Sequence, residues 1–154
     1  MRVGIVGLGT MGTTHAGGYQ NIADCELVAV ADIQPERCRA MVERYGVRSY
    51  ATLADMLVAE ALDVIDVCLP THLHLEHVEM AAAAGKHVFC EKPLARNRTE
   101  GEAMVKACRK AGVTLGVGHV VRFFPEYRRA KEIIASGQLG NVGTVYTYRG
   151  GGGF

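Results

Sequence analysis

The stretch RVGIVGLGTMG, residues 2–12, decides the fold class of this 154-residue chain. Its first part, Arg2–Val6, is an apolar run typical of a buried strand, and the pattern GxGxxG follows at once. The residues that come next, Gly12–Ile22, are predicted to form a helix. A strand that enters a helix through a glycine-rich turn is typical of the first βαβ unit of a parallel sheet.

Each glycine of the turn has a mechanical reason. Gly7 allows the tight turn, Gly9 lets the backbone approach a pyrophosphate, and Gly12 lets the helix pack closely on the strand. The start of the helix then presents free N–H groups to the phosphates. Asp32 ends the second predicted strand, about 20 residues later, where a carboxylate accepts hydrogen bonds from ribose hydroxyls. Together these features predict a dinucleotide site, and the alternatives are a turn that binds nothing or one that binds S-adenosylmethionine.

The acid also bears on the choice of cofactor. A carboxylate at Asp32 repels a 2′-phosphate, which favours NAD over NADP. Ile33 stands where an NADP enzyme would often place Arg or Lys, and Arg37 and Arg39 belong to the next predicted helix. We therefore expect NAD and leave NADP open. The contacts expected in this half of the site are Gly7, Leu8, Gly9, Thr10, Met11, Gly12, Asp32 and Ile33.

The composition is that of an ordinary globular protein. Hydrophobic residues make up 49% and charged residues 21%, which excludes a disordered chain. The formal net charge of +1 provides no field of one sign to attract nucleic acid or an acidic membrane surface.

No apolar run approaches the about 18 residues of a spanning helix, and residues 1–9 already form a strand and a turn, so no signal peptide is expected. The five cysteines lie far apart without a CxxC pair, which favours reduced thiols in a cytoplasmic protein.

Strand and helix patterns alternate along the chain. The apolar runs predicted as strands are Arg2–Val6, Glu26–Ala31, Val47–Tyr50, Asp63–Leu69, His87–Glu91 and Thr114–Gly118. The segments predicted as helices are Gly12–Ile22, Pro35–Tyr45, Leu53–Val58, Leu75–Ala84, Thr99–Ala111 and Glu126–Ala135. This alternation predicts an α/β fold, a doubly wound parallel sheet of six strands with helices on both faces.

The end of the sequence departs from this rhythm. Val142–Arg149 is rich in β-forming residues and predicts a further strand, followed by Gly150–Gly153. No later segment remains to pair with that strand, so we expect it to be disordered, packed on its own domain or paired with a copy of itself. The sequence thus predicts a nucleotide-binding domain over residues 1–122. Residues 123–154 are predicted to hold a connecting helix and the first strand of a truncated second domain.

Three loops follow predicted strands at their carboxyl ends, where ligands bind in open α/β sheets. The loop 69–71 is expected to form a wall of the nicotinamide pocket. Lys92 can donate to a substrate oxygen or move a proton, although most lysines lie on the surface. His119 and Arg122 could reach the pocket, and the plainer reading makes Arg122 part of a structural ion pair. The contacts expected from these loops are Leu69, Pro70, Thr71, Lys92, His119 and Arg122.

A histidine-rich segment raises the question of a metal. His72 and His74 stand two residues apart and would diverge on a helix. His74 and His77 could share a helix face, but two ligands do not make a closed metal site. Cys68 lies on a different predicted element. We therefore predict no metal site.

Several segments together resemble the Gfo/Idh/MocA oxidoreductase family. They are GIVGLGTMG, AVAD, CLPTHLH, AAAAGKHVFCEKPLA and GHVVRFFPEYRRAKEIIASGQLGNV, and the resemblance covers essentially the whole chain. It implies NAD(P)-dependent dehydrogenases of sugars, cyclitols and related polyols. In such proteins, usually more than twice this length, an N-terminal Rossmann domain precedes an α/β domain with an open antiparallel sheet. That second domain shapes substrate specificity and usually dimerises, which implies a homo-oligomeric parent.

The resemblance also implies roles for single residues. His74 matches a recurrent histidine that opens a helix, Glu91 a cofactor-contacting acid, and Lys92 a lysine that touches the substrate and helps proton transfer. Arg122 matches a common arginine, whereas His119 stands where members vary. The family's catalytic Asp and His pair lies beyond this chain, so we expect cofactor binding with little turnover. The alternatives are a non-enzymatic dinucleotide sensor and an enzyme of the biliverdin or dihydrodipicolinate reductase type.

Overall fold

The computed structural model describes residues 1–148 and 150, which divide into two compact units. The first unit is Met1–Gly118, and the second begins at His119. The division lies a few residues before the boundary predicted between residues 122 and 123. Whether the second unit begins a separate substrate domain stays a prediction.

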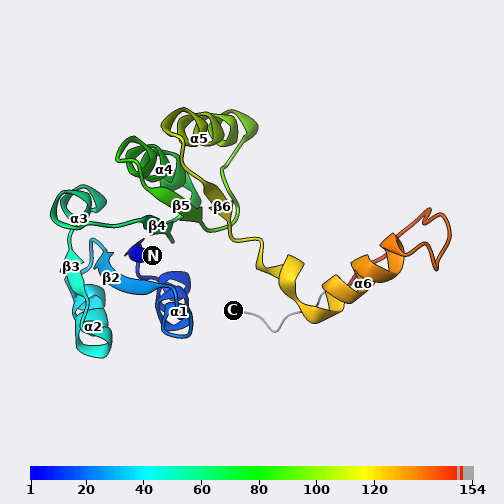
Figure 1. The fold of residues 1–154 in the computed structure, drawn as a ribbon, viewed down its shortest axis with the longest axis horizontal. Coiled ribbons are helices and arrows are strands. Elements are labelled where there is room, and N and C mark those ends of the chain that lie inside the picture. The colour runs from blue at the N-terminus through cyan, green and yellow to red at the C-terminus, as the bar shows by residue number, and fades with distance from the viewer. Residues whose placement is uncertain (149, 151–154) are drawn as a thin grey trace. The chain divides into compact units, whose positions relative to one another are not determined.

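The first unit is built on one parallel sheet (Figure 1). Its strands are β1 (Arg2–Val6), β2 (Glu26–Ala31), β3 (Arg48–Tyr50), β4 (Val64–Val67), β5 (His87–Cys90) and β6 (Leu115–Val117). Their order in the sheet is β3-β2-β1-β4-β5-β6, and each neighbouring pair is parallel. The predicted six-stranded doubly wound sheet is therefore confirmed. The strand order reverses between β1 and β4, and such a switch point opens a crevice for ligands.

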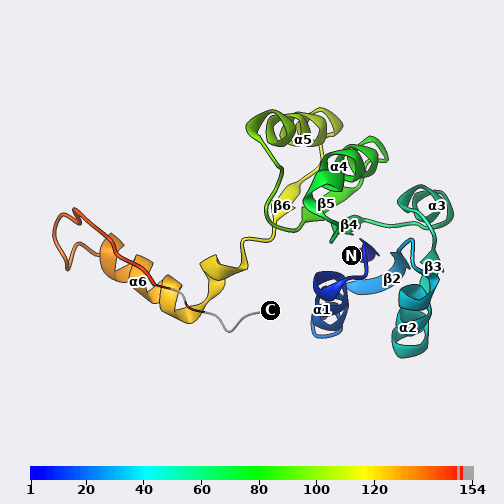
Figure 2. The same ribbon diagram turned by 180° about the vertical axis from the view of Figure 1, so that it is seen from behind.

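Helices cover the sheet on both faces, as the opposite views of Figures 1 and 2 show. They are α1 (Thr10–Tyr19), α2 (Pro35–Tyr45), α3 (Leu53–Ala59), α4 (His74–Ala83) and α5 (Arg98–Ala111), with a short 3₁₀ turn, η1 (Thr71–Leu73). One apolar core joins α1 and α2 to the sheet, around Ala16, Val30 and Met41. The other joins α3, α4 and α5 to the sheet, around Met56 and Met104.

Local sequence signals explain where the helices begin and end. Pro35 opens α2, where its missing N–H is not needed, and Gly46 ends that helix with φ of +67°. The Thr52 side chain caps α3 by accepting the Asp55 N–H at 3.1 Å. The first helix starts earlier than predicted, at Thr10, because Gly9 occupies the position before its first turn.

The second unit holds a 3₁₀ turn, η2 (Val120–Phe123), and one helix, α6 (Pro125–Ala135). The strand predicted over Val142–Arg149 is wrong for residues 142–148, which have no regular secondary structure, and Arg149 lies outside the described residues. A strand needs a neighbour to bond its N–H and C=O groups. The described part of this unit contains no strand that could provide such a neighbour, and Tyr146 remains 89% exposed. None of the helices formed by the described residues has the length and apolar character needed to cross a membrane.

Replacing Met104 by Ala is expected to lower the free energy of unfolding by about 2–5 kcal/mol, because this fully buried side chain joins α5 to the sheet. The control Val58→Ala removes a 90% exposed side chain and should change stability by less than about 0.5 kcal/mol. Urea unfolding followed by circular dichroism measures both. Equal losses in the two variants would contradict the packing of α5 against the sheet.

Candidate functional site

A cavity of about 670 Å³ lies where β1, β2, β3 and β4 end. The predicted contacts that line it are Gly7, Gly9, Thr10, Met11, Asp32, Ile33, Leu69 and Pro70. Residues that sequence reasoning did not assign to it complete the lining: Val6, Ala31, Gln34, Arg37, Ala51, Thr52, Leu53, Cys68, Leu73 and His77. The predicted contacts Leu8, Gly12, Thr71, His74, Glu91 and Lys92 are not part of this lining. His119 and Arg122 belong to the second unit, so their contact with the site stays a prediction.

The glycine turn is built as its sequence predicts. Gly7 has φ of +90°, and a Cβ there would lie 2.6 Å from the carbonyl oxygen of Cys68. A Cβ on Gly12 would overlap the carbonyl oxygen of Gly7, so only glycine lets α1 lie this close to the turn. At Gly9 no atom lies within 4 Å of such a Cβ, and the residue faces the open cavity. The turn therefore leaves space for a ligand beside Gly9, at the start of α1.

Asp32 holds the turn in place from the end of β2. Its Oδ2 accepts the N–H of Leu8 at 2.6 Å, and its Oδ1 accepts the N–H of Gln34 at 2.8 Å. Arg37 Nη1 lies 3.7 Å from Oδ2, so this arginine reaches the acid although it belongs to the next helix. The two backbone N–H groups use two of the about four lone-pair positions of this carboxylate, which lines the cavity.

His74 is buried, with 1% of its surface exposed. Its Nε2 lies 2.7 Å from the carbonyl oxygen of Leu69, and its Nδ1 lies 3.1 Å from that of Leu94. Both ring nitrogens are therefore directed at backbone of this protein. The side chain ties the loop after β4 to the loop after β5, and it positions the cavity wall at Leu69.

Glu91 and Lys92 follow β5 and differ sharply in exposure. Glu91 is buried, with its Oε2 accepting the N–H of Lys92 at 3.1 Å. Lys92 is exposed and precedes Pro93 through a cis peptide bond. The Lys92 side chain is therefore in contact with solvent, and its role toward a substrate stays a prediction.

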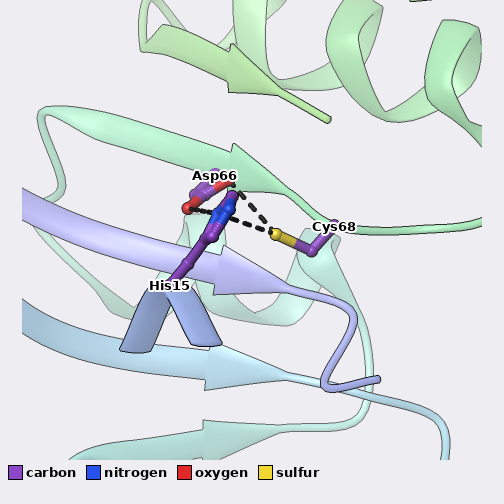
Figure 3. Close-up of side chains that lie close together, drawn as sticks. All are labelled: His15, Asp66 and Cys68. Atoms are coloured by element: carbon purple, nitrogen blue, oxygen red, sulfur yellow. Dashed lines mark hydrogen bonds and ion pairs between the residues drawn. The ribbon is translucent and has the colours of Figure 1, made fainter. Parts of the chain in front are cut away.

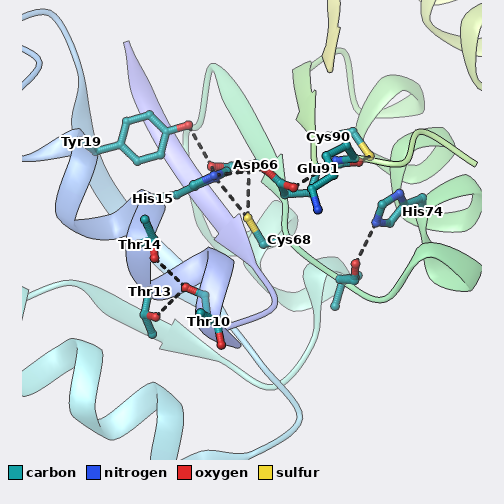
Figure 4. A network of polar contacts seen from close by, with 12 residues as sticks. Thr10, Thr13, Thr14, His15, Tyr19, Asp66, Cys68, His74, Cys90 and Glu91 are labelled. Atoms are coloured by element: carbon teal, nitrogen blue, oxygen red, sulfur yellow. Dashed lines mark hydrogen bonds and ion pairs between the residues drawn. The ribbon is translucent and has the colours of Figure 1, made fainter. Parts of the chain in front are cut away.

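Sequence reasoning missed a buried polar cluster behind the turn (Figures 3 and 4). His15 of α1 lies between two carboxylates: its Nδ1 is 2.9 Å from Asp66 Oδ2, and its Nε2 is 3.3 Å from Glu91 Oε1. The Tyr19 hydroxyl donates to Asp66 Oδ2 at 3.0 Å, and the Cys68 thiol donates to Asp66 Oδ1 at 3.3 Å. Asp66 is a charged residue inside the apolar run DVIDVCL, and that signal could have revealed the cluster because a buried charge requires partners.

The surroundings of these groups set their protonation. The hydrogen bond to Asp66 raises the pKa of His15 above its ordinary 6.5, more than burial lowers it. Burial raises the pKa of the Cys68 thiol and of the Tyr19 hydroxyl, so both keep their protons. A ring nitrogen of His15, a carboxylate oxygen of Asp66 and the sulfur of Cys68 lie within 4.8 Å of one another, a spacing that could hold a cation. Hydrogen bonds hold this group together, and they join His15 and Cys68 to Asp66.

The first unit has the features of a doubly wound nucleotide-binding fold. These are the strand order of its parallel sheet, the glycine turn at a helix start and the acid after β2. Residues 1–119 match the GFO_IDH_MocA family, described as an oxidoreductase family with an NAD-binding Rossmann fold, and the chain belongs to this family. The predicted family membership is thus confirmed.

Named relatives extend this comparison. The chain is 38% identical over 141 residues to the myo-inositol 2-dehydrogenase of Thermotoga maritima, and 37% identical over 144 residues to the D-glucoside 3-dehydrogenase of Escherichia coli. It covers 42% and 41% of these two relatives, which cover 91% and 92% of this chain. The chain therefore spans about two fifths of their length.

Solved structures agree with the sequence relatives. The WlbA dehydrogenase of Bordetella pertussis, in complex with NADH and UDP-GlcNAcA, has a TM-score of 0.87 and 36% identity. The myo-inositol 2-dehydrogenase of Lactobacillus plantarum has a TM-score of 0.87 and 32% identity. The matches cover 90% and 92% of this chain, and 43% of each solved chain.

The raised pKa of His15 makes stability depend on pH. The imidazolium stabilises the folded state fully below the unfolded value of 6.5, and this stabilisation is lost as the pH rises through the higher folded pKa. We therefore expect the free energy of unfolding to fall as the pH rises above about 6.5, the unfolded value of histidine. His15→Gln should remove this fall, as urea unfolding at each pH would show. The same slope in the variant would contradict the assignment.

Proposed function

We propose that this chain is the nucleotide-binding part of an NAD-dependent oxidoreductase. The parent protein would transfer a hydride between the nicotinamide and a CH–OH group of a sugar, cyclitol or similar polyol. The observation that carries this proposal is the cavity at the sheet's carboxyl edge, with Gly9 open to it and Asp32 beside it. Membership of the family and the names of the dehydrogenase relatives support the reaction class.

The residues that line the cavity fit the diphosphate and the adenosine ribose of such a cofactor. Backbone N–H groups at the start of α1, beside Gly9 and Thr10, would hold the diphosphate. The free lone pairs of Asp32 would accept the ribose hydroxyls and disfavour a 2′-phosphate. Arg37 lies close enough to this acid to offset part of its charge, which keeps NADP binding open. Leu69 and Pro70 would wall the cavity toward the nicotinamide.

The nicotinamide supplies the hydride chemistry when it is bound, and the protein supplies orientation and proton handling. We assign the proton-handling role to Lys92, which is exposed at the end of β5 and carries an ammonium that can donate to a substrate oxygen. Glu91 and His74 would position this loop and the neighbouring wall. We assign His119 and Arg122 to cofactor or substrate contacts in the complete protein.

The rest of the parent would complete the site. We infer that the second unit leads into a substrate domain, which would set specificity and form a homo-oligomer. The proposed setting is the cytoplasm, with a small polyol or sugar as partner and no nucleic acid or membrane. This chain alone would bind cofactor and turn over little.

Calorimetric titration with NADH and then NADPH tests the cofactor assignment. We expect NADH to bind more tightly by about tenfold or more, because the Asp32 carboxylate repels the 2′-phosphate. Asp32→Asn should reduce this preference, and its single side-chain oxygen can still accept one of the two N–H groups, of Leu8 or of Gln34. If neither NADH nor NADPH bound to this chain or to the longer parent, the proposed function would be overturned.

The glycines provide a matched pair of variants. Gly9→Ala should keep the stability of the fold and weaken NADH binding by about tenfold or more, since the new methyl enters the space for the diphosphate. Gly12→Ala should instead destabilise the fold, because its methyl overlaps the Gly7 carbonyl. Thermal unfolding and NADH titration separate the two effects. Tight NADH binding by a stable Gly9→Ala variant would contradict the placement of the diphosphate.

A further inference from the structure

The cluster behind the glycine turn has an unbalanced charge. Asp66 is fully buried in β4, and Glu91 is buried directly after β5. Across residues 1–148, the cation that the structure places within 4 Å of either carboxylate is His15. Two carboxylates facing a single imidazolium leave an excess of negative charge in a site that water screens poorly.

The other groups packed against His15 do not remove this excess. The Cys68 sulfur lies 3.3 Å from His15 Nδ1, and burial raises the pKa of this thiol, so it stays neutral. Tyr19 likewise keeps its proton and donates it to Asp66. The ring of Phe89 packs against His15 in a tilted arrangement, with 5.8 Å between centroids, and is uncharged. The net charge of the cluster therefore changes with the protonation of His15.

The position of the cluster relates it to one half of the proposed cofactor. In doubly wound folds the two halves of a dinucleotide lie on opposite sides of the switch point. Asp32, the acid proposed for the adenosine ribose, follows β2, whereas Asp66 and Glu91 belong to β4 and the end of β5 on the other side. Cys68, which contacts both His15 and Asp66, lines the cavity (Figure 4). The cluster thus lies on the nicotinamide side and borders the cavity through Cys68.

We propose that His15, Asp66 and Glu91 select the redox state of the cofactor, and this inference rests on the proposed function. Oxidised nicotinamide carries a positive charge that reduced nicotinamide lacks, so the excess negative charge favours NAD⁺ over NADH. Because His15 loses its positive charge as the pH rises, the preference for NAD⁺ increases with pH. An enzyme that oxidises alcohols benefits from this selection, since it binds NAD⁺ and releases NADH.

The ratio of the dissociation constants of NADH and NAD⁺ isolates this effect. Both cofactors share the adenosine, the diphosphate and the second ribose, so a general loss of structure weakens both and leaves the ratio unchanged. By Coulomb's law at an effective dielectric constant of about 20, a change of one charge near the nicotinamide alters the ratio by several-fold or more. His15, Asp66 and Glu91 would act as specificity-determining residues rather than as groups that take part in hydride transfer.

The test measures both dissociation constants by calorimetry at about pH 6.5 and about pH 8.5, with constant ionic strength. In the unmodified chain the ratio should rise several-fold with pH. His15→Gln should show a high ratio at both values of pH, and Asp66→Asn should show a lower ratio. Glu79→Gln, which removes an exposed carboxylate of α4, serves as the control and should behave like the unmodified chain.

The outcomes separate this inference from the proposed function. Binding of both cofactors with a ratio that neither pH nor the variants change by more than about twofold would overturn the inference and leave the proposed function standing. Binding of neither cofactor would overturn both. If His15→Gln does not fold, the pH dependence of the unmodified chain and the ratio in Asp66→Asn still decide the question.

Discussion

The contact between Gly12 and the carbonyl of Gly7 is the constraint on which the rest of the site depends. Because no side chain separates them, α1 lies close against the turn that joins it to β1. This closeness directs the free N–H groups of the helix start at the cavity beside Gly9. It also brings the next turns of α1 over β4, where His15 meets Asp66. One steric condition thus positions both the proposed phosphate site and the buried cluster.

The cluster gives this helix a second attachment. His15 joins α1 to β4 through Asp66 and to the end of β5 through Glu91, which borders the loop of Lys92. A buried charge of this kind is retained only when it is paired and hydrogen-bonded, and each member here has a partner. The arrangement connects the proposed diphosphate-binding helix to the loop proposed to handle protons. The first unit therefore holds a buried charged cluster on the side of the sheet where we propose that the nicotinamide binds.

The two units differ in how much apolar surface they bury and in their secondary structure. The first unit buries two apolar cores and bonds its strands within one sheet. The second unit holds one helix, and large apolar side chains outside that helix stay exposed, among them Phe123 and Leu139.

The sequence by itself determined the sheet, the helices and the glycine turn, because these follow from periodicity and local sterics. The helix Pro35–Tyr45 was predicted to the residue, since proline and glycine mark its ends. The strand predicted over Val142–Arg149 is wrong for residues 142–148, because strand formation depends on a partner that local sequence cannot supply. Only the tertiary structure decided that His15 meets Asp66, which is 51 residues away, and that His74 is buried against backbone carbonyls. Contacts of this kind depend on how helices cross the sheet, which no local pattern encodes.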